Sequence, residues 1–198
     1  MYSGLAEQVL ALKAAQLLRF PVHRGYLHVE VPEDDGVARL VEKGGISFLK
    51  LLERGVGVVA LHHSIGAFQD WSGYRRIIGT KFYLKETEEN GVKYQVGSYK
   101  HDVDFKVYVK DSEHPVTHGI NDFSIHDETY KGCVFEQDNR VLLTTDHPAS
   151  DEPLCWVRNY AKARVCYIQI GHGPGVYDDT NYRRLVLQAI KWCAVKED

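Results

Sequence analysis

Residues 56–64, Val-Gly-Val-Val-Ala-Leu-His-His-Ser, constrain the fold of this chain more than any other stretch. Five apolar residues, interrupted by one glycine, run directly into two histidines and a hydroxyl. Such a run predicts a strand that is buried on both faces, as is typical of parallel sheets. Ligands of open α/β sheets bind outside the carboxyl ends of the strands. We therefore expect His62, His63 and Ser64 to lie where a ligand binds.

Length and charge narrow the class of protein. The chain has 198 residues, 44% of them apolar, and shows no linker or repeat, which predicts a single domain over residues 1–198. A net charge of −3 gives no electrostatic reason to expect a nucleic-acid partner. No apolar run is long enough for a membrane helix, and the N-terminus shows no signal-peptide pattern. These features predict a cytoplasmic protein without a membrane partner.

Four cysteines occur, Cys133, Cys155, Cys166 and Cys193, and no two form a Cys-x-x-Cys pair. Nothing nearby in the sequence would lower the pKa of a thiol, as a nucleophilic cysteine requires. Buried, reduced thiols of a cytoplasmic protein are the expected state.

Hydrophobic periodicity and turn residues predict interleaved helices and strands. Helices are expected over residues 5–18, 37–43, 46–54, 74–78 and 181–194, and strands over 26–31, 56–61, 105–109, 123–125, 141–145 and 164–170. Gly55 is a plausible helix C-cap, and Asn90-Gly91 is a turn signal. This order favours an α/β fold with a mainly parallel sheet flanked by helices and an antiparallel edge within residues 80–160.

Several short motifs occur in an order that resembles one family. The motifs cover residues 57–64, 71–74 (Trp-Ser-Gly-Tyr), 78–82, 114–120 (His-Pro-Val-Thr-His-Gly-Ile), 122–130, 153–157, 160–165 and 171–172 (Gly-His). In this order they resemble the ThuA-like family, named for trehalose utilisation, within the class I glutamine amidotransferase-like superfamily. The resemblance is strongest over residues 46–194. It implies a flavodoxin-like core and a role in the metabolism of a trehalose-type disaccharide or an oxidised sugar.

The chain departs from the family pattern in three places. Thr80 and Tyr83 stand where the family has a glycine pair and a downstream histidine, and Ala-Lys-Ala-Arg at residues 161–164 replaces Gly-Lys-Gly-Arg. The first 45 residues match poorly. Glutamine amidotransferases also carry a cysteine nucleophile on the turn that here holds His62, His63 and Ser64, so glutamine hydrolysis through a thiolate is not expected. No Gly-x-Ser-x-Gly frame surrounds Ser64, so catalysis by a serine nucleophile is not expected either.

A cluster of histidines and carboxylates is the more plausible chemical centre. His62 and His172 each follow a strand and are the expected acid and base, with Asp127 or Glu128 orienting them. Candidate ligand-binding residues share polar tips or aromatic faces that suit a sugar ring. They are His63, Ser64, Trp71, Tyr74, His114, Tyr130 and Trp156.

Each of these residues also has a structural interpretation. His114-Pro115 could shape a turn and have no other role. Asp127 or Glu128 could cap a segment or pair with Arg164, and Trp156 could belong to the core. Strand alternation sends neighbouring side chains to opposite sides, so only His62 of the adjacent pair is expected in the cleft. Other histidines, His23, His28, His101 and His147, are expected at the surface.

Metal, mechanism and assembly stay open at this point. Histidine and carboxylate ligands would allow a divalent metal such as zinc, although no short ligand pair supports it. A sugar-processing enzyme is the first hypothesis. A non-catalytic carbohydrate-binding or sensing module is the alternative, motivated by Tyr83 in place of the family histidine. A homo-oligomer is a third expectation.

Overall fold

The structure, a computed structural model, describes residues 48–194. The helices expected over 5–18 and 37–43 and the strand over 26–31 lie outside the described residues. Residues from Leu52 onward form one compact unit. Residues 48–53 are helical, and Gly55 follows with a positive φ of 79°, as the sequence predicts for a helix end.

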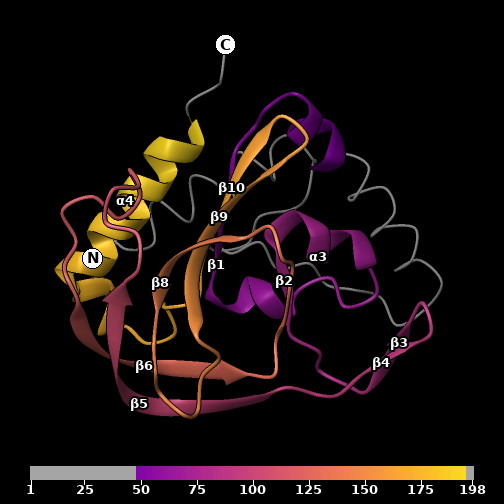
Figure 1. The fold of residues 1–198 in the computed structure, drawn as a ribbon, viewed down its shortest axis with the longest axis horizontal. Coiled ribbons are helices and arrows are strands. Elements are labelled where there is room, and N and C mark those ends of the chain that lie inside the picture. Colours follow the sequence, from indigo (N-terminus) through magenta and orange to yellow (C-terminus); the bar gives the residue numbers. More distant parts are fainter. Residues whose placement is uncertain (1–47, 195–198) are drawn as a thin grey trace. The chain divides into compact units, whose positions relative to one another are not determined.

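A six-stranded mixed sheet forms the centre of the unit (Figure 1). In spatial order its strands are β1 (Val58–Leu61), β10 (Ala163–Ile168), β9 (Pro153–Tyr160), β8 (Arg140–Thr144), β5 (Ser98–Val109) and β6 (Phe123–Lys131). β1 and β10 pair in parallel, and every other neighbouring pair is antiparallel. The expectation of a mainly parallel sheet is therefore wrong for the described residues.

The connections explain this difference. Parallel neighbours need a crossover of a dozen or more residues, usually a helix. Residues 98–168 contain no helix, so β5, β6, β8, β9 and β10 follow one another through loops and turns. The antiparallel edge expected within residues 80–160 extends over most of the sheet.

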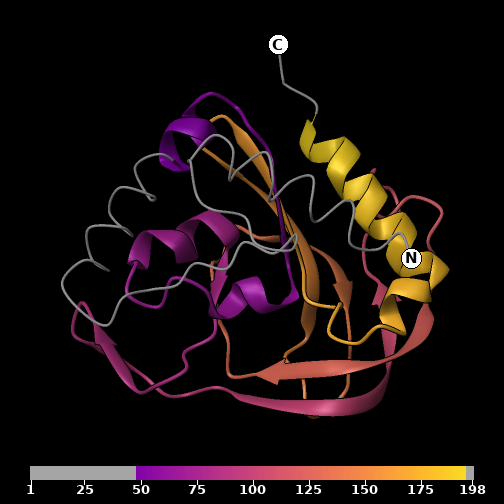
Figure 2. The same ribbon diagram turned by 180° about the vertical axis from the view of Figure 1, so that it is seen from behind.

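The sheet curls strongly at the β5–β6 end. Only Tyr108 and Val109 of β5 pair with β8, whereas the longer remainder of β5 pairs with β6. The β5–β6 register shifts between Lys100 and Val103, and Asp102 has a φ of 54°, a bulge of the kind that bends a strand. Both ribbon views show β5 and β6 running across the ends of the other strands (Figures 1 and 2). This curl brings β6 beneath the end of β1.

Two helices cover opposite faces of the β1–β10 region (Figure 2). α4 (Thr180–Ala194) packs Leu185, Ala189 and Cys193 into a core with Cys166 and Ile168. α3 (Ser72–Ile78) lies on the other face. There Trp156 stacks on Tyr167 with ring centroids 4.4 Å apart, and its Nε1 donates to the Ile78 carbonyl at 2.8 Å. The helices expected near 74–78 and over 181–194 are confirmed.

Short elements complete the unit. β2 (Thr80–Lys81) pairs with β7 (Val134–Phe135), and β3 (Thr87–Glu89) pairs with β4 (Val92–Tyr94). Asn90 and Gly91 turn the β3–β4 hairpin with φ values of 53° and 76°, so the predicted turn is confirmed. None of the helices in the described range could span a membrane.

Replacing Trp156 with Phe should lower the free energy of unfolding by about 1–3 kcal/mol, because it leaves the buried Ile78 carbonyl without its donor and removes packed volume. Urea unfolding followed by circular dichroism measures this. Trp71→Phe, at a partly exposed indole, should cost less. Equal losses for the two variants would contradict the structural role assigned to Trp156.

Candidate functional site

His62 stands where β1 ends and the 3-10 helix η1 (His62–Gly66) begins. Its φ of 37° is rare for a residue with a side chain and marks local strain. The ring is buried, and its Nδ1 lies 2.6 Å from the carbonyl oxygen of Gln169. A carbonyl only accepts hydrogen bonds, so Nδ1 carries the hydrogen and Nε2 presents a lone pair to its surroundings.

Glu128, on β6, is the centre of the cluster and is only 2% exposed. Its Oε2 lies 3.0 Å from His62 Nε2 and 3.3 Å from His172 Nδ1, and these two nitrogens are 3.2 Å apart. Tyr130 Oη donates to the same oxygen at 2.5 Å. The other oxygen, Oε1, lies 3.0 Å from His101 Nδ1. One carboxylate thus contacts three imidazoles and a phenol. His62, Glu128 and His172, predicted from separate strand ends, do come together.

Asp127 contacts the cluster through the backbone rather than directly. Its carboxylate accepts the N–H groups of Gly171 at 2.7 Å, His172 at 2.9 Å and Gly173 at 3.3 Å. Three hydrogen bonds therefore hold the loop after β10 and set the position of His172. A Cβ at Gly171 would come 2.8 Å from Tyr182 Oη, so glycine is needed for this close approach. Arg164 donates from Nη1 to the Trp192 carbonyl at 3.2 Å.

His63 also belongs to the cluster. Its Nδ1 lies 3.2 Å from Tyr130 Oη, and its ring centroid is 5.5 Å from that of His172. The expectation that only His62 of the adjacent pair reaches the cleft is therefore wrong. Alternation holds within a strand, but the strand ends at Leu61 and His62 starts a helical turn.

Burial sets the protonation state of the inner groups. Desolvation lowers the pKa of His62, and the carbonyl of Gln169 and the carboxylates of Asp127 and Glu128 oppose this only in part. Burial and the hydrogen bond to Glu128 raise the pKa of Tyr130. Near neutral pH the centre therefore contains a neutral imidazole at His62 and a protonated phenol at Tyr130.

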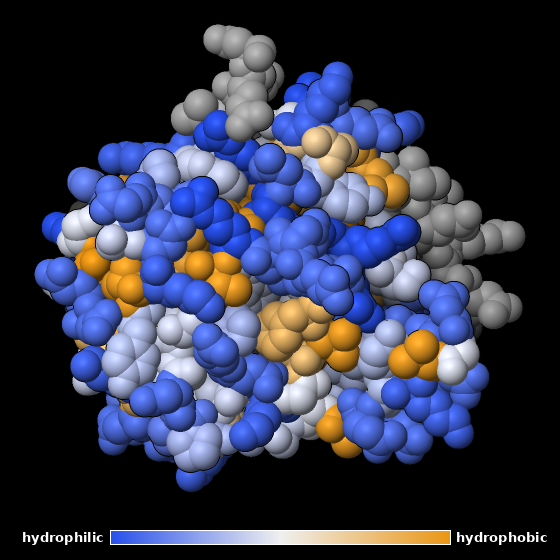
Figure 3. All heavy atoms as spheres, in the orientation of Figure 1, coloured by the Kyte–Doolittle hydropathy of each residue, from blue (hydrophilic) through white to orange (hydrophobic). Residues whose placement is uncertain are grey.

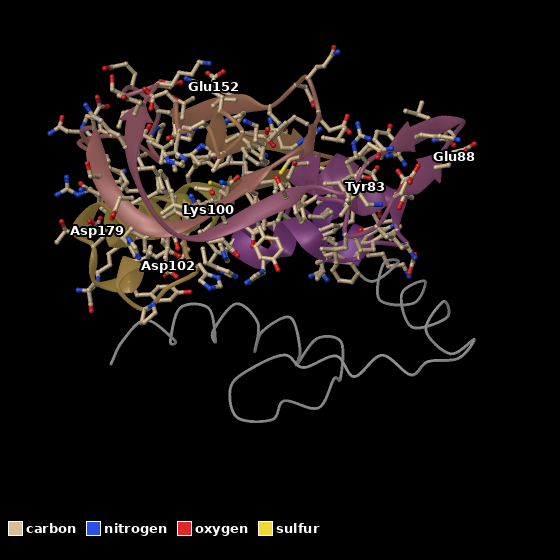
Figure 4. All side chains as sticks on the ribbon, turned by 90° about the horizontal axis from the view of Figure 1, so that it is seen from below. Tyr83, Glu88, Lys100, Asp102, Glu152 and Asp179 are labelled. Atoms are coloured by element: carbon tan, nitrogen blue, oxygen red, sulfur yellow. The ribbon has the colours of Figure 1, made fainter. Side chains whose placement is uncertain are left out.

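A cavity of about 420 Å³ adjoins Glu128 and opens to solvent. Four polar residues and a set of apolar ones line it. They are His63, His101, Glu128 and Tyr130 on the polar side, and Ile65, Ala67, Phe82, Leu84 and Tyr99 on the apolar side. Figure 4 views this end of the molecule and labels Lys100 and Asp102, the two neighbours of His101 on β5. The lining thus combines hydrogen-bonding groups with aromatic rings, which suits a sugar-sized ligand.

Sequence reasoning missed His101, which it placed among the surface histidines. Its side chain is 48% exposed, yet Nδ1 contacts Glu128. The β5 bulge between Lys100 and Val103 brings it there, and no local pattern in Lys-His-Asp announces a bulge. Tyr99 and Phe82 were missed for the same reason, because their role depends on how the sheet curls.

Other predicted ligand-binding residues lie outside the cluster and the cavity lining. Trp156 is fully buried in the core, and His114 is buried with its ring 5.1 Å from that of Trp192. His114 Nδ1 accepts the N–H of Val116 within its turn, as the structural interpretation of His114-Pro115 anticipated. These placements correct the ligand-binding predictions for Trp156 and His114.

Trp71, Tyr74 and Ser64 form a separate group. Trp71 and Tyr74 pack with Phe68, and Tyr74 is buried. Burial raises the pKa of Tyr74 to about 12. None of the three lines the cavity, and their contact with a ligand stays a prediction.

Tyr83, the residue that replaces the family histidine, also lies away from the cluster. It is fully buried, stacks on Tyr94 with centroids 4.6 Å apart, and donates to Glu89. In Figure 4 it lies toward Glu88 and the β3–β4 hairpin, away from Lys100 and Asp102. Tyr83 is therefore not a member of the histidine–carboxylate cluster.

The four cysteines are free, and Cys155, Cys166 and Cys193 are buried. Burial is the main cause that raises the pKa of the Cys133 and Cys193 thiols, and for Cys166 the main cause is a hydrogen bond with Cys155. Raised values disfavour the thiolate that a nucleophile needs. The turn after β1 carries histidines and serine instead.

The fold and site together define an α/β protein with a histidine–carboxylate centre at the carboxyl end of its parallel strand pair. The sequence profile of the ThuA family, described as trehalose utilisation, matches residues 35–193. The chain belongs to this family. No curated protein gives a significant match.

Solved structures share the fold at low sequence identity. A putative ThuA-like protein from Parabacteroides merdae aligns with a TM-score of 0.65 and 22% identity over 78% of this chain and 66% of that one. One from Bacteroides uniformis aligns with a TM-score of 0.58 and 22% identity over 76% and 63%. A β-galactosidase from Bacillus circulans aligns with a TM-score of 0.50 and 10% identity over 77% and 21%. The chain thus spans slightly less than two thirds of the two ThuA-like relatives.

Proposed function

We propose that this protein binds a sugar or sugar derivative in the cavity beside Glu128 and catalyses proton transfer on it in the cytoplasm. The observation that carries the proposal is the group of four imidazoles, one carboxylate and one phenol, of which His63, His101, Glu128 and Tyr130 line the cavity. Family membership supports the sugar class of the ligand, since the family is described by trehalose utilisation.

The residues in and around the cavity have different roles in the proposed function. Tyr99 and Phe82 offer aromatic faces to the apolar side of a sugar ring. His63, His101 and Glu128 face the same cavity and can hydrogen-bond sugar hydroxyls or exchange a proton with them. His62 and His172 lie behind Glu128 and act on the ligand through it, with Asp127 positioning His172. A trehalose-type disaccharide or an oxidised sugar is the substrate class.

The alternative, a non-catalytic binding module, has lost the observation that motivated it, because Tyr83 lies outside the centre. Isothermal titration calorimetry together with product analysis distinguishes the two functions. Trehalose, other disaccharides and their keto derivatives form the test panel. Saturable binding with a product formed supports the enzyme. Saturable binding without any product after long incubation would favour the module and overturn the proposed catalysis.

Tyr99→Ala should weaken ligand binding, because it removes an exposed aromatic wall while leaving the polar centre in place. An aromatic contact of this kind contributes roughly 0.5–1.5 kcal/mol beyond the area it buries, so KM for the active panel member should rise at least several-fold. Tyr108→Ala, at the other end of β5, is the matched control. An unchanged KM in Tyr99→Ala would place the ligand elsewhere.

The predicted homo-oligomer stays a prediction. On the face in Figure 3, hydrophilic side chains cover most of the surface and hydrophobic ones form small separate patches. Sedimentation velocity of the full chain would show whether it associates.

A further inference from the structure

Three atoms of the cluster form a nearly equilateral triangle. The edges are 3.0 Å between His62 Nε2 and Glu128 Oε2, 3.2 Å between His62 Nε2 and His172 Nδ1, and 3.3 Å between His172 Nδ1 and Glu128 Oε2. We propose that these three atoms hold one divalent first-row transition metal, with zinc as the representative ion. The inference deepens the proposed function by naming the cofactor of the same centre.

The triangle has the size that a metal requires. Zinc binds imidazole nitrogen and carboxylate oxygen at about 2.0–2.2 Å, and tetrahedral geometry then separates two ligand atoms by roughly 3.3–3.5 Å. The observed edges approach these values, so side-chain shifts of a few tenths of an ångström suffice. Two histidines and one carboxylate on one face of a metal, with the other positions open, form a recurring catalytic ligand set.

The orientation of the rings makes lone pairs available to a cation. Because the Gln169 carbonyl can only accept, His62 Nδ1 donates to it and Nε2 presents a lone pair to Glu128 Oε2, 3.0 Å away. His172 presents a second lone pair at Nδ1, 3.2 Å from His62 Nε2, in the tautomer that carries its hydrogen on Nε2. A cation at the face of the triangle would bind both nitrogens and the carboxylate oxygen, which are ligand atoms that zinc accepts.

The surrounding residues resemble the outer shell of a metal site. A ligating histidine usually donates its second ring N–H to a carbonyl or carboxylate, which fixes its tautomer and orientation, as Gln169 does for His62. The ligating carboxylate is itself hydrogen-bonded, here by Tyr130 at Oε2, with His101 at Oε1. Asp127 fixes the backbone of His172.

A further position remains for the ligand. The ligand atoms of His62, His63, Glu128 and His172 all lie within 4.8 Å of one another. His63 is exposed and lines the cavity, so it can complete the metal site or yield its place to a sugar oxygen. A metal there would polarise a bound carbonyl or hydroxyl group, which is the Lewis-acid role of catalytic zinc.

The test uses the purified full chain, stripped with EDTA and titrated with ZnCl₂ by calorimetry. CoCl₂ serves as a spectroscopic probe, because Co²⁺ bound by protein ligands in four- or five-fold coordination absorbs visible light strongly. We expect one equivalent of each ion and a rise in melting temperature with zinc. His172→Ala, at a side chain that is 37% exposed, should weaken zinc binding by more than about 100-fold, beyond the roughly 10–100-fold typical of outer-shell losses.

His126→Ala is the matched control, because it removes an exposed histidine from β6, the strand that carries Glu128. It should bind zinc as the wild type does. His62→Ala provides a second ligand variant, and circular dichroism checks that each variant is folded. Absence of saturable zinc and cobalt binding by the wild type, or equal affinity in wild type and folded His172→Ala, would overturn the metal site.

The two proposals fail in different ways. A chain that binds one zinc through the triangle but turns over no sugar supports the metal site and refutes the proposed catalysis. A chain that turns over a sugar equally well before and after EDTA treatment, with no bound metal, supports the catalysis and refutes the metal site.

Discussion

Glu128→Gln should reduce turnover of the active sugar by roughly 10²–10⁴-fold, the range expected when a proton-transfer group is lost. The carboxylate contacts His62, His172, His101 and Tyr130 at once. A neutral amide keeps the volume but removes the charge and one acceptor oxygen. Initial rates over the panel of disaccharides and oxidised sugars measure the effect.

The stability of the Glu128→Gln variant shows whether the loss of activity comes from the chemistry or from unfolding. An amide nitrogen in place of one carboxylate oxygen leaves a buried donor without its acceptor, so the variant should lose about 1–3 kcal/mol of unfolding free energy and remain folded while its activity falls. Glu152→Gln, at an exposed carboxylate, is the control and should retain full activity. Wild-type rates in a folded Glu128→Gln would remove this residue from the mechanism.

Asp127→Asn should cost about 1–3 kcal/mol of unfolding free energy and also lower activity. In the structure Oδ1 accepts from His172 and Gly173, and Oδ2 accepts from Gly171. An amide can place its oxygen at only one of these sites. Its NH₂ group then faces a backbone N–H, so a buried donor loses its acceptor and the loop that carries His172 moves.

Urea unfolding and the zinc affinity together test the role assigned to Asp127. A positioning residue should weaken both, and the loss of affinity should be smaller than in His172→Ala. Asp151→Asn provides the comparison, because Asp151 Oδ2 accepts the single backbone N–H of Cys133 away from the cluster. If Asp127→Asn loses stability as expected but keeps wild-type zinc affinity and activity, Asp127 has a structural role only.

Much of the site could be predicted from the sequence because chemistry-bearing residues stand at element ends. His62 follows β1, His172 follows β10, and Glu128 lies within a motif just after the strand predicted over 123–125. The motif order also indicated the family, which the profile match confirms. These signals are local, and local signals are what a single sequence carries well.

The features that sequence reasoning missed depend on contacts between distant segments. The strands at residues 123–125 and 105–109 were predicted too short, and β9 was not predicted. Residues 98–102 of β5 are all exposed, whereas residues 127–130 of β6 and 154–157 of β9 are all buried, so these segments lack the alternation of a half-buried strand. The direction of strand pairing depends on the geometry of the connecting loops, which the sequence pattern does not reveal. The sheet was therefore wrongly predicted to be mainly parallel. The cavity position of His101 results from a bulge.

Aromatic residues illustrate the same limit. Trp156, Tyr74 and Tyr130 all lie in family-like motifs, and each could have faced a ligand. Trp156 and Tyr74 pack on the α3 side of the sheet, whereas Tyr130 lies at the curled end where β6 meets η1. The motifs alone do not tell which ring faces a ligand, because this depends on how the elements pack against one another.

Anomalous diffraction at the zinc edge from crystals of the full chain grown with ZnCl₂ tests the central claim most directly. We expect one strong peak about 2.0–2.2 Å from His62 Nε2, His172 Nδ1 and Glu128 Oε2, next to the cavity lined by Tyr99 and His101. A map with these three side chains ordered but apart from one another, and with zinc bound only at surface histidines, would contradict it.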